Sequence, residues 1–522
     1  GFIPYSRYFN DNFIHFSNYD NIRSIPSICD GLKPSQRKIL YTVIKKNIKK
    51  SNNIKVSQLA NKVSELTCYL HGEVSLCDAI VNMAQQFVGT NNINLLYPMG
   101  NFGTRNQGGK DDAASRYIYT YGNVLLDKIY RKEDEVVLKS RIEENTIIEP
   151  YNYYSIVPMP LINGAVGIGT GYSTKIPMFN PIDIINNLIS YLDDTEDTKL
   201  LKPWYYGFNG FIKLIKSKKG ERNYISIGKC QIQNAARNGK IIISELPIGT
   251  WTEDYVNDIK KKIIAARQQT KSPEAEDKEC YFKDIENKSS PEDINIILTV
   301  ESKFIQDYQR NIYEDPNGYI NIDGQDISIS LLNKLKLITP LNLSNMYLYD
   351  FEGKIKKYET PEDILNDFFN HRQKIYINRK KIYIKILQNE LNILMWKIKF
   401  IDDYINKIII IERKKKSEII EQLENLKYPK LNSNYKAEEK DKNYNYIIDI
   451  KLFDLTEEKI SELTEKMKKK KEELEIYEST KYATIWKNEL LELKEAYILN
   501  YPEITKDKKK VIKKRQPRTK KQ

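Results

Sequence analysis

The stretch Gly108-Gly109-Lys110-Asp111-Asp112-Ala113-Ala114-Ser115-Arg116-Tyr117-Ile118-Tyr119-Thr120 places an arginine next to a tyrosine, after a glycine pair and a run of small residues. A phenol is a poor nucleophile at neutral pH because its ordinary pKa is about 10. A neighbouring cation favours the phenolate, and it also stabilises negative charge on a group under attack. The small residues would let a bulky polyanion come close. Arginine-tyrosine pairs are common on protein surfaces, so the spacing alone is weak support for catalysis.

Five motifs occur in the order and at the spacing that one protein family shows. They are Asp30–Leu40 (DGLKPSQRKIL), His71-Gly72-Glu73, Gln85–Gly89 (QQFVG), Asn101–Thr120 (NFGTRNQGGKDDAASRYIYT) and Leu161–Gly171 (LINGAVGIGTG). Together they resemble the region around the active-site tyrosine of eukaryotic type II DNA topoisomerases. The resemblance is dense from Phe13 to Pro181 and continues more patchily through most of the remaining chain.

The resemblance implies roles for individual residues. Tyr117 would attack a DNA phosphodiester and leave a 5′-phosphotyrosine and a free 3′-hydroxyl, and Arg116 would stabilise the charge that builds up on phosphorus. His71 would hold the scissile phosphate, although the family's usual histidine pair before Gly-Glu is Leu70-His71 here. Ile168 would wedge between base pairs and bend the duplex. The other predicted DNA-binding residues are Arg23, Lys33, Arg37, Lys38, Ser75, Arg105 and Lys110.

The composition suits a polyanionic partner. The 522 residues carry a formal net charge of +13 at pH 7, which favours nucleic acid or an anionic membrane surface without identifying either. The five cysteines are scattered with no Cys-x-x-Cys pair, which favours reduced thiols over a disulfide framework or a zinc site. No apolar run reaches the roughly 18 residues of a transmembrane helix, so we expect no membrane partner.

Residues 1–153 are expected to form a mostly helical domain with a helix-turn-helix. Pro34 suits the first position of a helix. Apolar residues recur at helical spacing from Val56 to Leu66, a break follows at Tyr69–Gly72, and a second helix is expected from Glu73. Many helical domains show this pattern. The resemblance assigns it to the winged-helix domain that carries the catalytic tyrosine.

Residues 154–344 are expected to form a mixed α/β region, which the resemblance assigns to the tower domain. The predicted strands and helices are Lys240–Glu245, Ile294–Val300, Ile182–Leu192 and Asp254–Arg267. The run Gly167-Ile168-Gly169-Thr170-Gly171 departs from the dinucleotide-binding pattern G-x-G-x-x-G. It is therefore interpreted as a glycine-rich turn that presents Ile168.

Residues 345–500 are expected to form a long antiparallel coiled-coil arm with a small head. Apolar residues recur three and four positions apart over Pro361–Lys427 and Ile460–Tyr497. About 60 residues at ~1.5 Å each would reach about 90 Å in an unbroken helix. In the resembled family the head is the C-terminal dimer gate, which implies a homodimer. An elongated helical hairpin without a gating role fits the same periodicity.

The end of the chain, residues 501–522, is rich in Lys and Arg and is expected to be a disordered tail. A nuclear-import or DNA-binding segment and a merely solvated tail fit this composition equally well. Localisation in the nucleus is what the resemblance implies.

The cofactors of the resembled family, Mg²⁺ and ATP, have no recognisable ligands in this sequence. The family holds Mg²⁺ with a glutamate and an Asp-x-Asp cluster, and no convincing Asp-x-Asp-x-Asp motif is present, so no metal ligand is assigned. The phosphate-binding pattern G-x-x-x-x-G-K-[ST] is also missing. We expect the metal-binding and ATPase regions upstream of Gly1, and we expect this chain alone to bind DNA and dimerise but to cut poorly.

These features together predict an α+β multidomain protein with a winged-helix domain, a mixed α/β tower and a coiled-coil arm. The predicted function is the breakage–reunion core of a type II DNA topoisomerase, which acts on double-stranded DNA as a homodimer. Two alternatives stay open. One is a bacterial gyrase A-like subunit, which the Gly-Gly-Lys-Asp context and the lack of a C-terminal wrapping domain disfavour. The other is a non-enzymatic architectural DNA-binding protein.

Overall fold

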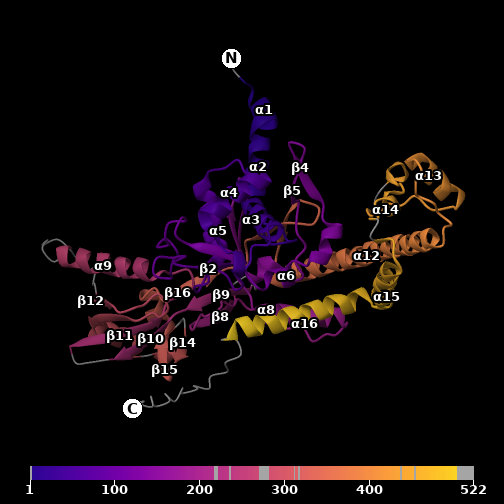
Figure 1. Cartoon of the computed structure of the whole chain (residues 1–522). Helices are drawn as coiled ribbons and strands as arrows, with labels where there is room; N and C mark the ends of the chain where they lie inside the picture. The colour runs from indigo at the N-terminus through magenta and orange to yellow at the C-terminus, as the bar shows by residue number, and fades with distance from the viewer. Residues whose placement is uncertain are drawn as a thin grey trace, which may run out of the picture. The chain divides into compact units, whose positions relative to one another are not determined.

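The computed structural model describes residues 3–216, 222–233, 237–269, 281–310, 312–315, 318–435, 438–451 and 454–502. They form a mixed α+β structure whose elements are labelled in Figure 1. The chain divides into two compact units. The first comprises Gly1–Arg131, Leu138–Phe369 and Leu490–Gln522, and the second comprises Lys132–Val137 and Asn370–Glu489.

A three-helix group beside a small sheet opens the first unit. In the sheet, β3 lies between β1 and β2 and pairs antiparallel with both. Helix α4 ends at Thr67, and the left-handed backbone of the next residue, Cys68, turns the chain sharply towards α5. The elements are α3 (Pro34–Lys45), α4 (Val56–Thr67), α5 (Glu73–Ala84), β1 (Ile54–Lys55), β2 (Leu96–Met99) and β3 (Tyr119–Gly122). The predicted helix-turn-helix and its second helix from Glu73 are confirmed.

The last part of the N-terminal helical run packs on a hairpin. The run comprises α1 (Tyr5–Tyr8), a π-helical turn at Phe9–Phe13 and α2 (Ile14–Ser24), and the hairpin comprises β6 (Ala165–Ile168) and β7 (Ser173–Ile176). Glycines allow the close approach, because a Cβ on Gly167 would lie 2.0 Å from the Ser24 carbonyl oxygen and one on Gly169 would lie 2.2 Å from Asn21 Oδ1. The interpretation of this glycine-rich stretch as a turn that presents Ile168 is therefore confirmed.

The same hairpin continues into residues that were expected to belong to the arm. Lys175 N–H donates to the Asn345 carbonyl at 2.8 Å, and Tyr347 N–H donates to the Thr174 hydroxyl at 3.1 Å. Strands β17 (Met346–Tyr349) and β18 (Ile355–Tyr358) thus belong to the first unit. These hydrogen bonds tie Asn345 and Tyr347 to the hairpin within the first unit, which runs on to Phe369.

A larger α/β part completes the first unit. Its four-stranded antiparallel sheet has the order β10-β11-β13-β12, and α9 runs beside β12 (Figure 1). Burial alternates along β11 as expected for a strand with one face in the core, where Ile241 and Ile243 are buried. The predicted strands and helices of this region are confirmed. They correspond to β11 (Asn238–Glu245), β13 (Ile296–Glu301), α8 (Pro181–Leu192) and α9 (Thr252–Gln269), and the outer strands are β10 (Lys229–Gln233) and β12 (Phe282–Asn287).

Smaller elements surround these two parts of the first unit. A second antiparallel sheet has the order β16-β9-β8. The remaining described α-helices and strands of this unit are β4 (Ser140–Glu143), β5 (Thr146–Pro150), α6 (Leu126–Ile129), α7 (Met159–Ile162), β8 (Phe211–Lys216), β9 (Arg222–Ile227), α10 (Ser302–Gln309), β14 (Tyr319–Ile322), β15 (Gln325–Ser328), α11 (Ile329–Lys334) and β16 (Ile338–Leu341).

The second unit is helical and is built on α12, a 45-residue helix from Pro361 to Ile405 that begins in the first unit. At ~1.5 Å per residue this helix is about 68 Å long. The other helices are α13 (Lys416–Asn425), α14 (Asn445–Ile448), α15 (Glu457–Ser479) and α16 (Tyr482–Asn500), and α16 continues into the first unit. A small apolar core around Phe400, Ile401 and Ile447 forms the predicted head.

The predicted second long helix is broken, and this part of the prediction is wrong. Helix α15 ends at Ser479, Thr480 is extended, and α16 begins at Tyr482. The Ser479 hydroxyl donates to the carbonyls of Glu475 and Ile476. Lys380 Nζ donates to the carbonyls of Glu478 and Thr480. These side chains hydrogen bond to carbonyls at the end of α15, where the supply of intrahelical N–H partners runs out.

Buried charges join the helices of the second unit. Asp134 accepts from Arg372 Nη2 at 2.6 Å and from Arg379 Nη1 at 3.2 Å. Arg379 Nη2 also donates to Glu489 at 2.6 Å, and the Tyr376 hydroxyl donates to the same carboxylate. Two guanidinium groups thus face two carboxylates, which offsets the cost of burying each charge.

Among the described helices, none has both the length and the apolar character needed to cross a bilayer. The expected basic tail at 501–522 lies outside the described residues, apart from its first two positions.

Candidate active site

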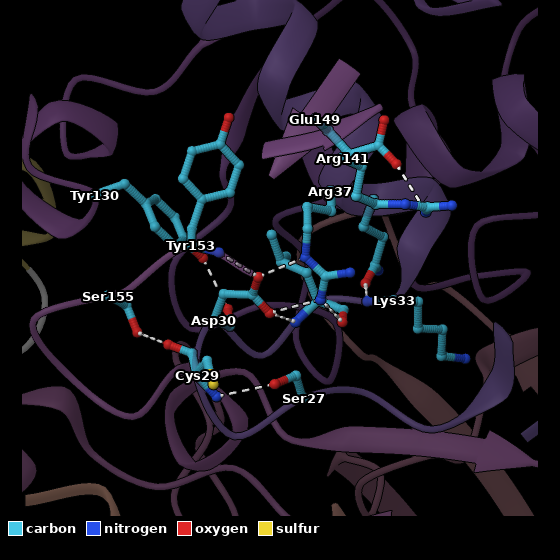
Figure 2. Close-up of polar contacts among 12 residues, drawn as sticks. Ser27, Cys29, Asp30, Lys33, Arg37, Tyr130, Arg141, Glu149, Tyr153 and Ser155 are labelled. Carbon is cyan, nitrogen blue, oxygen red and sulfur yellow. Dashed lines mark hydrogen bonds and ion pairs between the residues drawn. The ribbon is translucent and has the colours of Figure 1, made fainter. Parts of the chain in front are cut away.

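A buried carboxylate organises the loop that precedes α3 (Figure 2). Asp30 accepts from Arg37 Nε at 2.7 Å and from Arg37 Nη2 at 3.0 Å. The same carboxylate accepts from the backbone N–H groups of Leu32 at 3.0 Å and of Tyr153 at 2.9 Å. Arg37 Nη2 returns to the Leu32 carbonyl at 2.9 Å. The loop is therefore fixed from both ends, and Lys33 follows it directly.

Lys33 begins α3 at the edge of this buried pair. Its backbone N–H donates to the Gln36 side chain at 2.9 Å, which caps the helix. Its ammonium group points away from Asp30 and Arg37 (Figure 2). Partial burial lowers the pKa of the Lys33 ammonium group, because desolvation penalises the charged form. A phosphate near this ammonium would offset that cost.

His71 lies in the turn just before α5, between two tyrosines. Its Nε2 is 2.7 Å from the Tyr19 hydroxyl, and its ring packs edge-on against Tyr69 with centroids 5.3 Å apart. Burial lowers the pKa of His71, and the positive charges of Arg23 and Lys38 lower it further. The imidazole is therefore mainly neutral at pH 7, with one nitrogen that donates and one that accepts.

The loop that carries the candidate nucleophile is braced internally. Asp111 accepts from the Thr104 N–H at 2.7 Å and from the Thr104 hydroxyl. Glycines allow tight packing, since a Cβ on Gly108 would lie 2.3 Å from the Trp251 ring nitrogen and one on Gly109 would lie 2.3 Å from Gln85 Nε2. Both glycines therefore pack against protein atoms.

Tyr117 lies at the end of this loop, next to the first turn of α4. Ser57 N–H donates to the Ser115 carbonyl at 3.2 Å, and Val56 N–H donates to the Ile118 carbonyl at 3.0 Å. Ile118 is buried, whereas Tyr117 is 67% exposed. The Arg116 guanidinium lies 5.0 Å from the centre of the Tyr117 ring. The phenol is thus held by its neighbours' backbone and presented to solvent beside a cation.

The loop and the helix-turn-helix meet at a second point. The Ser115 side chain is hydrogen bonded to Cys77 on α5. Ser75 is exposed on the first turn of α5, where unpaired backbone N–H groups favour anions. Lys110 is exposed on the loop, and Ile168 is 81% exposed at the end of β6.

Residues 23–491 match the family of DNA gyrase/topoisomerase IV A subunits. The chain belongs to this family. It is 37% identical to "DNA topoisomerase 2" of Acanthamoeba polyphaga mimivirus over 95% of this chain and 41% of that protein. It is 36% identical to human "DNA topoisomerase 2-alpha" over 94% of this chain and 31% of that protein. The chain thus spans between about a third and two fifths of the length of these relatives.

A solved structure of the family has the same fold. The crystal structure of the Plasmodium falciparum topoisomerase II DNA-binding, cleavage and re-ligation domain matches with a TM-score of 0.79 at 34% identity. The match covers 96% of this chain and 65% of that one. The α+β fold class and the resemblance to type II topoisomerases are therefore confirmed.

Three of the predicted DNA-binding residues are engaged inside the protein. Arg37 is buried, and although burial opposes its charge, Asp30 raises the pKa of its guanidinium above the ordinary value. Lys38 is buried between the Thr67 carbonyl and Glu149. Arg105 is buried between Glu245 and the Leu246 carbonyl. Donors of these three residues thus serve internal partners, and contact of these residues with DNA stays a prediction.

The structure brings part of the predicted site together. Arg23, Lys38 and His71 lie close enough for both cations to affect the histidine. In the part of the chain that the structure describes, no hydrogen bond or ion pair joins this cluster directly to Tyr117. The sequence prediction missed Tyr19 and Tyr69, which flank His71. Tyr19 precedes Arg23 by four residues, so helical spacing could have placed both on one face of α2.

The described residues contain no group of three or more His, Cys, Asp and Glu side chains arranged to hold a metal ion. These side chains therefore do not form a site for the Mg²⁺ that the family uses. The reaction proposed for this chain uses no metal ligand from the described residues.

The buried Asp30–Arg37 pair predicts a large effect of a small change. Asp30→Asn keeps the shape but removes the charge that compensates Arg37, so it should lower the free energy of unfolding of the first unit by about 3 kcal/mol or more. Chemical denaturation followed by circular dichroism measures this change. Asp127→Asn is the control, because its exposed pair with Lys49 at 3.7 Å should be worth less than about 1 kcal/mol. Equal stabilities of the two variants would contradict the prediction.

The electrostatics of His71 predict a change in its titration. Arg23→Gln removes a positive charge that disfavours the imidazolium, so the pKa of His71 should rise but stay below the ordinary value of about 6.5, because burial remains. At a pH near 6 a larger fraction of His71 would then be protonated. Histidine NMR titration, with His71→Asn for assignment, measures the shift. Arg7→Gln is the control, since Arg7 on α1 pairs with Asp11 in the π-helical turn that follows. An unchanged His71 pKa in Arg23→Gln would contradict the prediction.

Proposed function

We propose that this chain is the DNA breakage–reunion core of a type II topoisomerase, with Tyr117 as the nucleophile. The observation that carries the proposal is an exposed tyrosine beside an arginine, on a loop anchored to both helices of a helix-turn-helix. Family membership and the similarity to the Plasmodium falciparum cleavage domain support it.

The proposed reaction is a transesterification. The Tyr117 oxygen attacks the phosphorus of a DNA phosphodiester and the P–O bond to the 3′-oxygen breaks. The phenol proton passes to water, and the departing 3′-oxygen takes up a proton from water to become a hydroxyl. Arg116 stabilises the negative charge that develops on the pentavalent phosphorus, and His71 and Lys33 hold the phosphate oxygens. The phosphotyrosine keeps the energy of the original bond, so the free 3′-hydroxyl can reverse the step without a high-energy cofactor.

DNA binding is proposed for five members of the predicted set, which are the half-buried Lys33 and the exposed Arg23, Ser75, Lys110 and Ile168. The first turn of α5 offers Ser75 and backbone N–H groups to phosphate. Ile168 stands at the tip of a hairpin that Asp20 and Asn21 tie to α2. An apolar side chain on a firmly held hairpin is suited to unstack a base step and bend the duplex.

Dimerisation follows from the number of nucleophiles. One tyrosine cuts one strand, so a double-strand break needs two chains related by symmetry. We assign the dimer gate to the head of the second unit, the tower to the part around β10–β13, and the winged-helix domain to the part that carries Tyr117. The partner is double-stranded DNA, and supercoil relaxation and decatenation are the proposed outcomes.

The cofactors and the location are also proposals. The family's Mg²⁺ would assist departure of the 3′-oxygen, and ATP would drive strand passage, with their ligands outside the residues described for this chain. We propose the nucleus as the site of action, in keeping with the eukaryotic relatives.

Tyr117→Phe should abolish covalent capture of DNA. The variant removes only the attacking oxygen, so the trapped adduct should fall by at least about 10³-fold while DNA affinity changes by less than about twofold. The chain fused to a metal-binding region of the family is incubated with supercoiled DNA and Mg²⁺ and quenched with detergent, and linearised DNA is measured.

The matched control is Tyr119→Phe, two residues along on β3, which should cleave like the wild-type chain. Loss of the adduct in both variants would show a general defect of the loop. If the wild-type chain binds DNA but forms no adduct, the alternative of an architectural DNA-binding protein is favoured.

A further inference from the structure

The contact between Tyr19 and His71 joins two segments that are 52 residues apart in the sequence. The Tyr19 hydroxyl lies 2.7 Å from His71 Nε2, and the ring centroids are 6.1 Å apart with a tilted arrangement. We propose that Tyr19 is a positioning residue of the cleavage site, whose hydroxyl holds the His71 imidazole so that Nδ1–H is free to donate to the scissile phosphate. This inference deepens the proposed function and rests on it.

Tyr19 is held firmly enough for this role. The two residues that follow it bind the turn after β6, where the Thr170 hydroxyl donates to Asp20 at 2.8 Å and Asn21 Nδ2 donates to the Thr170 carbonyl at 3.1 Å. The close packing of Gly167 and Gly169 on α2 fixes the same stretch. Since α2 cannot slide against the hairpin, the Tyr19 hydroxyl has a defined place relative to the turn before α5.

The neighbouring residue offers His71 no alternative partner. The Leu70 side chain is apolar and 86% exposed, so it offers the imidazole no hydrogen bond. Tyr69 packs its ring edge-on against His71 and restricts ring tilt. A hydrogen bond at one imidazole nitrogen determines which tautomer the other nitrogen adopts. Tyr19 is thus the group that selects the tautomer of His71.

The direction of the hydrogen bond follows from the charges around the ring. The groups that face His71 are Tyr19 and Arg23 from α2, Tyr69 from the turn and Lys38 from α3. Two of them are cations, so the imidazole stays neutral and can accept at one nitrogen. A phenolic O–H is a better donor than a neutral imidazole N–H, so Tyr19 donates to Nε2 and the ring proton lies on Nδ1.

The hydroxyl also suits the protonated form of the ring. When a phosphate binds and the imidazole takes up a proton, Nε2–H can donate to the Tyr19 oxygen after the hydroxyl rotates. The side chain therefore keeps the ring orientation in both protonation states. A phenyl ring in its place would keep the packing and lose this control.

Tyr19→Phe is the direct test. In ¹⁵N-histidine spectra of the wild-type chain, the neutral His71 should have its proton on Nδ1, and Tyr19→Phe should shift the population towards the Nε2–H tautomer. In the cleavage assay the rate constant at saturating DNA should fall about fivefold to tenfold, the effect expected for loss of one hydrogen bond. The dissociation constant for DNA should change by less than about twofold.

Tyr8→Phe on α1 is the matched control, since Tyr8 packs against Phe9 and Phe13 and makes no contact with His71 among those described. It should leave both the spectrum and the rate unchanged. A Tyr19→Phe variant with the wild-type tautomer, or with the wild-type cleavage rate, would overturn the proposal.

The two proposals fail in different ways. If the wild-type chain never forms a covalent adduct, the proposed function fails, and the tautomer measurement still decides whether Tyr19 controls His71. If the wild-type chain forms the adduct and Tyr19→Phe matches it in spectrum and rate, only the positioning role of Tyr19 fails.

Discussion

Burial of the Asp30 carboxylate against the Arg37 guanidinium is the constraint on which the candidate site depends. A charge in this position is tolerated only because it meets an opposite charge and two backbone N–H groups. The Tyr130 hydroxyl adds a hydrogen bond to the Asp30 carbonyl at 2.9 Å. These contacts bring together the loop before α3, the start of α3 and the chain near Tyr153. They fix the position of Lys33, which caps the N-terminus of α3.

The remaining parts of the site are positioned in the same manner, by contacts to the backbone. The loop with Tyr117 is held at the first turn of α4 through Ser115 and Ile118. The hairpin with Ile168 is held on α2 through Asp20 and Asn21. The reactive and DNA-facing side chains can therefore stay exposed while their backbones are rigid, which is what positioning of a large polyanionic substrate requires.

The fold was largely predictable because its signals are local. Helical spacing located α4, α5 and α9, and alternation located β11 and β13.

The end of a helix and the burial of a charged side chain were harder to predict. The end of α15 depends on Lys380, which reaches the exposed carbonyls from another helix. Arg37, Lys38 and Arg105 were expected to face DNA because basic residues in a motif suggest phosphate, but their acidic partners lie far away in the sequence or inside the loop. Tyr19 was missed because its partner follows 52 residues later.

The central claim is that Tyr117 forms the covalent bond to DNA, and transfer of a label tests it most directly. DNA carrying ³²P at the scissile phosphate is cleaved by the chain fused to a metal-binding region, the complex is trapped with detergent and digested, and the labelled peptide is sequenced. The account predicts label on the peptide that contains Tyr117, linked to the 5′ side of the break. Label on another peptide, or linkage to the 3′ side, would contradict it.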